Sequence, residues 1–373
     1  MAEEVFNLYD HAKLFGPDGK LAAVAKVLDQ NNVILHDALM IESNSDDGHH
    51  FSVQNGISKV VWRRAYEGVR PTKGSTTMVK KTYGRASAVS EVDVAVAEKG
   101  GKVSDVRASM AAEKLDRMAE EQAHKIIYGS LKEDERTFEG FAANYSSLDP
   151  NVPASRQVVD FTKETSVAAA QTVSANSNSS IYFIGWGKDK IYTFYPKGTQ
   201  AGIKVYDYSK NGPIDLKDAD GGTYPGYKEQ YEMLMGMAVQ DWRYGARLCN
   251  INVNAVATDK QAKIDLYEAF MKTLGLIKNI NNCKLVCYAS RQVKDLLRSG
   301  YMAAGGVTVF QNNNMTSSGN QGYGAADLVI DGIHIKAEDA IHHKEAEVES
   351  LGDTGSDTEG DSGENSGGDS EGE

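Results

Sequence analysis

Residues 100–102 (Gly-Gly-Lys), followed by Ser104, contain the residue types of a phosphate-binding loop. In such a loop, backbone N–H groups and a lysine bind phosphate oxygens. The first glycine of that motif is missing, and a serine or threonine should stand where Val103 is found. The pattern therefore does not predict nucleotide binding.

Residues 218–221 (Asp-Ala-Asp-Gly) resemble part of a calcium-binding loop, in which carboxylates at alternate positions bind the cation. Leu216 occupies the position of the first ligand, where an aspartate is needed. The Asp and Gly content predicts a turn instead.

The chain has three cysteines, Cys249, Cys283 and Cys287. The odd number and the absence of a disulfide-scaffold spacing favour a reducing compartment. We expect Cys283 and Cys287 to lie in one strand with their side chains on the same face. Small buried apolar side chains are a better interpretation of this pair than metal ligands or nucleophiles.

Histidines and catalytic motifs also give no evidence for a catalytic or metal-binding site. His49-His50 and His342-His343 lie in polar segments without a partner at metal-ligand spacing. The sequence contains neither Gly-x-Ser-x-Gly nor His-Glu-x-x-His. We therefore predict no catalytic, cofactor-binding or metal-ligating residue, and an enzyme is a minor alternative.

The strongest chemical feature is a concentration of positive charge. Eight Lys and Arg residues stand between positions 57 and 85, against one acidic residue, Glu67, which gives a local net charge of +7. A poorly apolar segment with this charge cannot form a core, so it should contact an acidic surface outside its own fold. The eight residues are Lys59, Arg63, Arg64, Arg70, Lys73, Lys80, Lys81 and Arg85.

Alternating and β-branched residues predict that these charges lie on an extended hairpin spanning 57–101. We expect strands at 57–66 and 78–85, joined by a long turn, and a further strand at 91–96. Residues 1–56 contain too little apolar sequence for a core of their own and are predicted to be an arm.

A long helix is predicted from Lys102 to Gly129, because apolar residues recur at helical period without an internal Pro or Gly. Ser104 is the expected N-cap, and Gly129 the expected C′ residue. Pairs at i,i+4, namely Glu113 with Arg117 and Glu121 with Lys125, should support its polar face.

The rest of the chain is predicted to be mixed α and β structure. We expect a hairpin formed by 181–186 and 191–195, an extended run over 231–253, a helix capped by Thr258 or Asp259 and ended by Gly275, and a strand at 284–288. A helix over 290–300 should follow, and then a tight hairpin around Asp331-Gly332.

The net charge of −12 is a property of the C-terminal end. Residues 345–373 contain 11 Asp and Glu and no Lys or Arg, which leaves 41 acids and 40 bases in the remaining 344 residues. This Gly-, Ser- and acid-rich tail should be disordered. No run approaches the ~18 apolar residues of a membrane span, and the N-terminus lacks a signal-peptide pattern.

The order of these parts resembles the major capsid proteins of tailed bacteriophages, specifically the podovirus type. The matching residues span 20–255, whereas 258–336 matches only in its α/β pattern. The matching residues within 20–255 are Val27–Leu35, Val61-Trp62-Arg63, Gly68–Lys73, Ser90–Asp93, Gly185-Trp186-Gly187, Tyr195–Gly198, Asp218–Gly222 and Asp241–Tyr244.

The resemblance implies an α+β, Hong Kong 97-like capsid fold. It assigns 1–56 to the N-terminal arm and 57–101 to the extended loop. The long helix, at 102–129, becomes the spine of a peripheral domain (102–158 and 225–257), and 159–224 with 258–344 form an axial domain. Residues 345–373 are a tail without precedent in the family.

The implied function is a structural one, in which copies of the chain form hexamers and pentamers of an icosahedral head around double-stranded DNA. The eight basic residues would form an interface between subunits. Scaffold, portal and cement or decoration proteins are possible partners, and no cofactor or membrane is implied. The expected location is the virion, assembled in the bacterial host cytoplasm.

Some relatives crosslink their subunits through a Lys and an Asn, but no such pair is assigned in this sequence. A nucleic-acid-binding protein that uses the basic hairpin is the main alternative function. The acidic tail should point outward or toward a partner protein, because packaged DNA would repel it; a solubilising appendage without a partner is the other interpretation.

Overall fold

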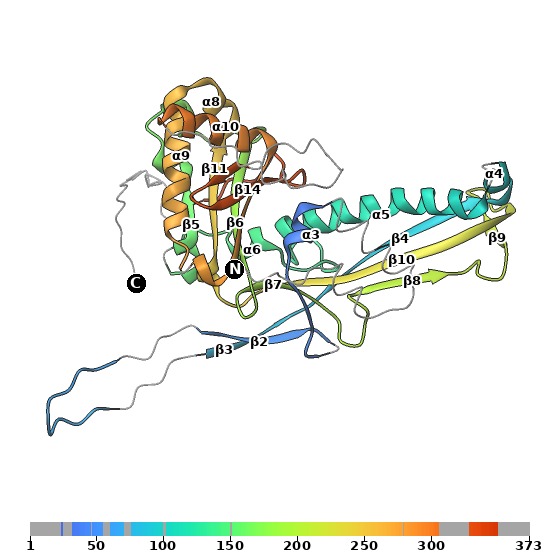
Figure 1. Ribbon diagram of the computed structural model, residues 1–373, viewed down its shortest axis with the longest axis horizontal. Coiled ribbons are helices and arrows are strands. Elements are labelled where there is room, and N and C mark those ends of the chain that lie inside the picture. The colour runs from blue at the N-terminus through green and yellow to red at the C-terminus, as the bar shows by residue number, and fades with distance from the viewer. Residues whose placement is uncertain are drawn as a thin grey trace, which may run out of the picture.

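Figure 1 shows a compact module joined to a long arm, with a narrow hairpin that projects away from both. This computed structural model describes residue 24 and residues 32–45, 47–54, 60–70, 76–99, 102–149, 151–278, 280–305 and 328–349. Within these residues, no helix is both long and apolar enough to cross a membrane.

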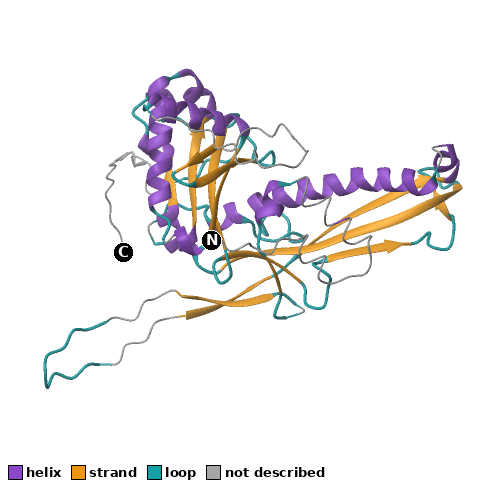
Figure 2. Cartoon of the chain, viewed as in Figure 1, coloured by secondary structure: helices purple, strands orange, loops and turns teal. Residues whose placement is uncertain are grey.

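The compact module has a mixed sheet covered by helices (Figure 2). Its strands are β5 (Val158–Asp160), β6 (Asn178–Trp186), β11 (Gly245–Asn252), β12 (Lys284–Ala289), β13 (Leu328–Ile330) and β14 (Ile333–Ala337). Its helices are α7 (Phe161–Glu164), α8 (Val253–Thr258), α9 (Lys260–Gly275) and α10 (Arg291–Ala303).

The arm consists of one long helix over long strands, as Figure 2 shows. The helices are α4 (Val94–Lys99) and α5 (Val103–Tyr128), with α6 (Phe141–Asn144) at the base. The strands are β4 (Gly84–Asp93), β8 (Ile203–Asp207), β9 (Ile214–Lys217) and β10 (Thr223–Val239). At its base lie α3 (Val33–Asp37), β1 (Met40–Glu42) and β7 (Ile191–Tyr195).

One sheet of 12 strands runs through both parts, with its main path in the order β13-β14-β12-β6-β7-β10-β4. The expected hairpin of β6 and β7 is wrong, because these strands share only one parallel bridge, Trp186 to Ile191. The turn at 187–190 redirects the chain from the compact module to the arm, where β7 pairs with β1 and β10.

Predictions for the compact module are largely confirmed. The Asp259 carboxylate accepts hydrogen bonds from the backbone of Gln261 and Ala262, and Ser290 caps α10 in the same way. Asp331 and Gly332 have φ of 52° and 79°, as the tight turn between β13 and β14 requires. Local sequence signals therefore determine these element ends.

Helix α10 continues to Ala303 and does not end at Gly300. Gly300 is buried, and a Cβ atom there would lie 2.0 Å from the backbone oxygen of Lys263 in α9. The glycine is therefore explained by close packing of two helices, and the prediction that it ends the helix is wrong.

The predicted long helix is confirmed as α5, over Val103–Tyr128. Its N-cap is Lys102 without a side-chain bond, so the assignment of Ser104 is wrong. Gly129 has a φ of −52°; a Cβ atom there would lie 2.4 Å from the backbone oxygen of Phe138. Close approach, not a left-handed conformation, favours glycine at this position.

One of the predicted ion pairs on α5 is present, Glu121 with Lys125 at 3.7 Å. The other is wrong, because Arg117 pairs with Glu120 at 2.5 Å instead of with Glu113. Both spacings, i,i+3 and i,i+4, bring side chains together on a helix, so the sequence could not separate them.

The basic hairpin differs from its prediction. Strand β3 (Thr76–Lys81) pairs with β2 (His49–Gln54), and residues 60–66 form no strand. Strand β4 pairs with β10 along the arm and ends at Asp93, whose carboxylate accepts a 2.7 Å hydrogen bond from the Ala95 backbone. That local cap begins helix α4 where we predicted strand.

Part of the predicted N-terminal arm belongs to the core. The side-chain oxygen of Asn32 caps α3, and its amide nitrogen lies 3.4 Å from the backbone oxygen of Ala119 in α5. Ile34 and Leu35 are fully buried in the cluster that α5 contributes to. Residues 1–23 and 25–31 lie outside the described residues.

The extended run predicted over 231–253 is interrupted. Strand β10 ends at Val239, and a short 3₁₀ turn at Trp242–Tyr244 precedes β11. Asp241 caps that turn through a 3.1 Å bond from the Arg243 backbone. The interruption transfers the chain from the arm to the compact module.

The packing of α9 against α10 gives a first prediction. Gly300→Ala should lower the free energy of unfolding of the unassembled subunit by about 1–3 kcal/mol, because the new methyl group displaces the Lys263 backbone. Gly275→Ala is the control, since nothing lies within 4 Å of its Cβ position. Denaturant unfolding followed by circular dichroism measures both; equal stabilities would contradict the packing role.

Candidate functional site

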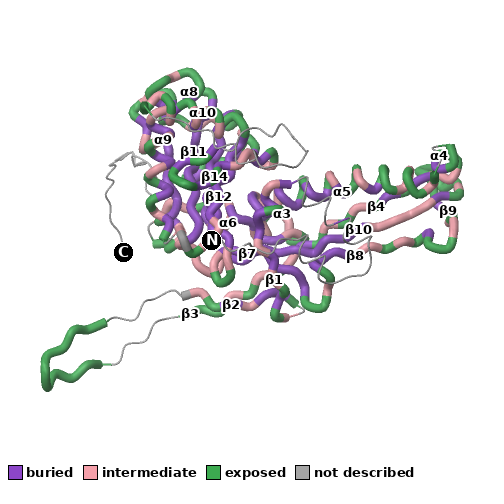
Figure 3. Tube along the Cα trace, in the orientation of Figure 1, coloured by how far each residue is buried: buried purple, intermediate pink, exposed green. Residues whose placement is uncertain are grey.

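The loop 60–70 at the tip of the projecting hairpin is exposed along its whole described length (Figure 3). Large apolar side chains face solvent there, with Trp62 at 95% and Val60 at 87% exposure, and Tyr66 fully exposed. Exposed aromatic side chains beside arginines are characteristic of protein interfaces. The loop has the composition of a contact surface.

The arginines of this loop lack acidic partners. Glu67, its one carboxylate, accepts a 2.9 Å bond from the backbone N–H of Arg64, and Arg63 reaches only the backbone oxygen of Glu67. Among the described residues, no carboxylate lies within ion-pair distance of Arg63, Arg64 or Arg70. Their charge is left for something outside the described chain.

Other basic residues of the hairpin behave differently. Lys80 pairs with Asp47 and Lys81 with Glu139, so each of these two lysines has an acidic partner within the chain; their contact with a neighbouring subunit stays a prediction. Burial also lowers the pKa of Lys81. The fold brings carboxylates distant in sequence to the base of the hairpin, which the sequence could not show.

The remaining predicted interface residues are spread out. Arg85 is exposed on β4, in register with Leu234 of β10. Lys59 and Lys73 lie outside the described residues. Arg63, Arg64 and Arg70 therefore lie in one exposed loop, whereas Arg85 belongs to the arm.

Among the described residues, no layer covers one face of the arm sheet. Strand β4 places Ala86 and Ala88 against the cluster containing Leu115 of α5, whereas Val89 points the other way and is 41% exposed. Val89 stands opposite Gln230, which stands opposite Tyr206 of β8. This row forms a second surface available to a partner.

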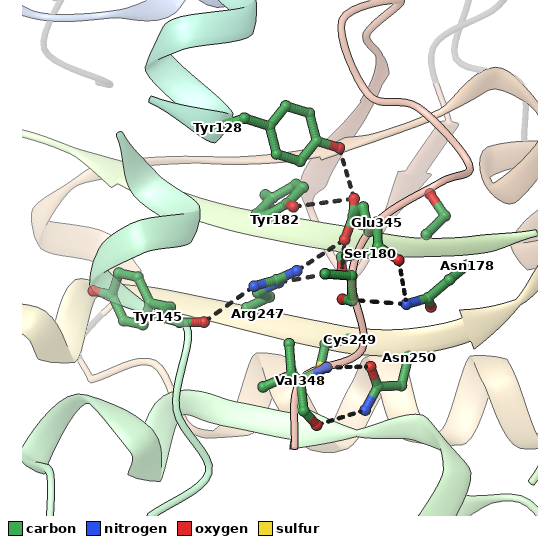
Figure 4. A network of polar contacts seen from close by, with 12 residues as sticks. Tyr128, Tyr145, Asn178, Ser180, Tyr182, Arg247, Cys249, Asn250, Glu345 and Val348 are labelled. Atoms are coloured by element: carbon green, nitrogen blue, oxygen red, sulfur yellow. Dashed lines mark hydrogen bonds and ion pairs between the residues drawn. The ribbon is translucent and has the colours of Figure 1, made fainter. Parts of the chain in front are cut away.

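Where the arm meets the compact module, a buried polar network surrounds Glu345 (Figure 4). Its carboxylate lies 2.8 Å from the guanidinium of Arg247 in β11, and only 2% and 6% of these side chains are exposed. Tyr128 of α5 donates to it at 2.6 Å and Tyr182 of β6 at 3.1 Å, and Ser180 donates a further bond.

The residues after Glu345 are held by backbone contacts. Asn178 accepts from the Glu345 N–H and donates to its carbonyl oxygen at 3.0 Å. Asn250 forms two 3.0 Å hydrogen bonds with the backbone of Val348, whose side chain is buried. The prediction of a disordered tail from 345 is therefore wrong for 345–349; residues 350–373 lie outside the described residues.

This network was missed at the sequence level, although one signal existed. Arg247 stands in a run of otherwise uncharged residues, Gly245–Asn252, that forms a fully buried strand. A buried arginine is stable only beside a negatively charged partner. Glu345 lies almost 100 positions away, in a segment whose composition predicts solvent exposure. Burial alone would lower the pKa of Arg247, but electrostatic interactions with Tyr182 and Glu345 outweigh burial and raise this pKa.

The near-miss motifs do not form sites. Asp218 accepts bonds from the backbone of Asp220 and Gly222, which confirms the turn. His49 is buried and lies 2.9 Å from the hydroxyl of Tyr192. In the described part of the chain, no cluster of His, Cys, Asp and Glu could hold a metal ion.

The cysteines behave as apolar core residues. Cys249 and Cys287 are fully buried, and burial raises the pKa of each thiol. Cys283 precedes β12 and is partly buried, so it does not share that strand with Cys287 as predicted.

Comparison with known families decides what this architecture is. The sequence profile of the major capsid protein GP7 family matches residues 16–349. The chain belongs to this family. Its role is therefore that of a structural protein of a bacteriophage capsid shell, as the resemblance predicted.

Solved structures agree with the family. A chain in the cryo-EM structure of bacteriophage epsilon15 is 25% identical, with a TM-score of 0.57 over 84% of this chain and 89% of that chain. The predicted Hong Kong 97-like fold is thereby confirmed.

Further solved structures match at lower similarity, and two of them serve as examples. A chain of the bacteriophage JBD30 capsid is 9% identical, with a TM-score of 0.42 over 71% of this chain and 81% of that chain. A chain of the empty GTA particle capsid is 9% identical, with a TM-score of 0.39 over 59% of this chain and 90% of that chain. No curated protein sequence matches.

The buried pair gives a second prediction. Arg247→Met should lower the free energy of unfolding by about 3–5 kcal/mol, because Glu345 would be left as an uncompensated buried charge. Arg291→Met removes an exposed pair with Asp339 and should change stability little. Urea unfolding of the two variants compares them; similar losses would show that the buried pair does not support the fold.

A third prediction concerns pH. Glu338 is buried, its Oε2 atom has no hydrogen-bond partner among the described residues, and burial raises its pKa from 4.5 to about 7. The folded chain therefore holds this proton more tightly than the unfolded chain. The corresponding stability is present below pH 4.5 and is lost as the pH rises through 7.

Glu338→Gln should accordingly stabilise the subunit at a pH above 7, by up to about 3 kcal/mol, and make little difference near the unfolded pKa. The exposed Glu347→Gln is the matched control and should show no such pH dependence. Thermal unfolding across pH measures both variants, and parallel curves for wild type and Glu338→Gln would refute the assignment.

Proposed function

We propose that copies of this chain form an icosahedral head of hexamers and pentamers, in which the loop 60–70 of each subunit lies on a neighbour. The observation that supports this most directly is the loop itself, whose arginines have no acidic partner among the described residues and whose large apolar side chains are exposed. Packaged double-stranded DNA is the proposed content of the head.

Energetics favour such a contact only in an assembly. Ordering an exposed loop costs about 1–2 kcal/mol per residue in backbone entropy, which one weak contact cannot offset. In a closed shell, each subunit gives a loop to one neighbour and receives one from another, so the contacts reinforce each other. A shell can thus be stable although each interface is modest.

The proposed domains follow the sheet pairing. Helix α5, β4 and β10 form the peripheral domain, and β6, β11, β12, α9 and α10 form the axial domain. Pairing moves several pieces relative to the sequence-based assignment: β4, β8 and β9 pair with β10, β11 pairs with β6, and β2 pairs with β3. The loop with β2 and β3 is the extended loop.

The proposed role is structural and non-enzymatic. We place the chain in the virion, with assembly in the host cytoplasm. Scaffold, portal and cement proteins are proposed partners. No observation favours the alternative of a nucleic-acid-binding protein that uses the loop.

The loop gives a fourth prediction. Replacing Arg63, Arg64 and Arg70 together by Gln should abolish shells, because the contact with the neighbour loses its charges. Subunit folding should be unchanged, since these side chains are exposed. Negative-stain microscopy and sedimentation measure assembly, and circular dichroism measures folding.

The matched control replaces the same three residues by Lys, which keeps the charge, and should form shells at reduced yield. Normal shells from the Gln variant would contradict the proposed role of the loop. A loss of tight, salt-sensitive DNA binding by free subunits in the Gln variant would instead support the nucleic-acid alternative.

A further inference from the structure

Charge in this chain is separated into two segments of opposite sign. The loop 60–70 carries Arg63, Arg64 and Arg70 without acidic partners among the described residues. Residues 350–373 contain eight Asp and Glu residues and no Lys or Arg. Neither family membership nor fold assigns a partner to this acidic segment.

The structure determines where the acidic segment starts. Glu345 is fixed by Arg247, and Val348 is fixed by Asn250 of β11, so the acidic segment starts from the exposed residue 349 beside β11. The segment is therefore attached to a rigid buried anchor on every subunit.

The length of the segment sets what it can reach. A chain advances at most ~3.3–3.6 Å per residue, so residues 350–373 can extend up to about 80 Å from the anchor. This distance exceeds the length of α5, which at ~1.5 Å per residue spans roughly 39 Å. The segment can therefore reach the surface of an adjacent subunit.

We propose that the acidic segment 350–373 of one subunit lies against the basic loop 60–70 of a neighbouring copy. The inference rests on the proposed function, because the loop lies on that neighbour and thus comes near the neighbour's anchor. The hairpin projects away from its own compact module, as Figure 1 shows. Crosslinking distinguishes a contact between two chains from a contact within one chain.

The contact is electrostatic and distributed. Single exposed ion pairs contribute little, but a run of carboxylates facing several arginines sums many weak terms. Such a contact is screened by salt, with a Debye length of about 10 Å at 0.1 M and about 3 Å at 1 M. The acidic segment would also keep DNA away from the loop, because like charges repel.

Crosslinking between two distinguishable subunits tests the contact. One subunit ends after Glu349 and keeps its native loop; the other keeps its acidic segment but carries Lys59→Arg and Lys73→Arg, which retain charge and remove the reactive amines. The two are co-expressed, and mixed particles are treated with a carbodiimide, which condenses a lysine amine with a carboxylate.

Peptide mass spectrometry should then find Lys59 or Lys73 joined to carboxylates of 353–373, a product that can form only between chains. If the product appears in wild-type particles but not in mixed ones, the contact lies within one chain and the proposal is wrong. If it appears in neither, the segment does not contact the loop and the proposal is equally wrong.

A second experiment measures the contribution to assembly. The eight acidic residues of 350–373 are replaced by Asn and Gln, which preserves length and leaves the anchor intact. Particles of this variant should release roughly tenfold more free subunits than wild type at about 50 mM salt and the same amount at about 1 M. If the variant and wild type release equal amounts of free subunits at both salt concentrations, the proposal is wrong.

The loop contact and the acidic-segment contact are tested by different variants. If the loop does not join subunits, the Gln variant of its arginines still forms shells. If only the contact of the acidic segment is wrong, the Gln variant of the loop arginines still fails to form shells. Neutralising the acidic residues of 350–373 then leaves the release of free subunits unchanged.

Discussion

The buried contact between Arg247 and Glu345 is the interaction on which the architecture depends. It connects β11 of the compact module to the last described segment of the chain, and Tyr128 extends it to the end of the long helix. An ion pair removed from water stabilises only when its remaining hydrogen-bonding groups are satisfied, and here hydroxyls and backbone groups surround it. Because its members come from both parts of the molecule, it fixes their relative position.

That rigid junction explains how the molecule can support a poorly packed projection. The hairpin of β2 and β3 is anchored at its base by ion pairs to Asp47 and Glu139, while its tip is entirely exposed. A free subunit gains nothing from the tip and must later order it. In the proposed shell, every tip would lie on a neighbouring subunit, so the element would be stabilised in the assembly.

The charges of the chain also fall into two groups. Ion pairs at the hairpin base, along α5 and in the junction join charges within the fold, whereas Arg63, Arg64 and Arg70 of the loop have no carboxylate within ion-pair distance among the described residues. The body is nearly neutral, so the loop and the acidic segment 350–373 dominate the electrostatic field that one subunit presents to another. The pattern favours association between copies and disfavours close contact of the acidic segment with DNA.

The sequence alone determined the elements whose signals are local: the long helix, the helix capped by Asp259, the strand before Ser290 and the turn at Asp331-Gly332. It also carried enough family resemblance to predict the capsid fold. Only the tertiary structure decided that β3 pairs with β2, that β6 and β7 belong to different parts, and that Glu345 is buried. Strand partners and buried ion pairs join residues far apart in the chain, and their energies depend on a proximity that local patterns do not encode.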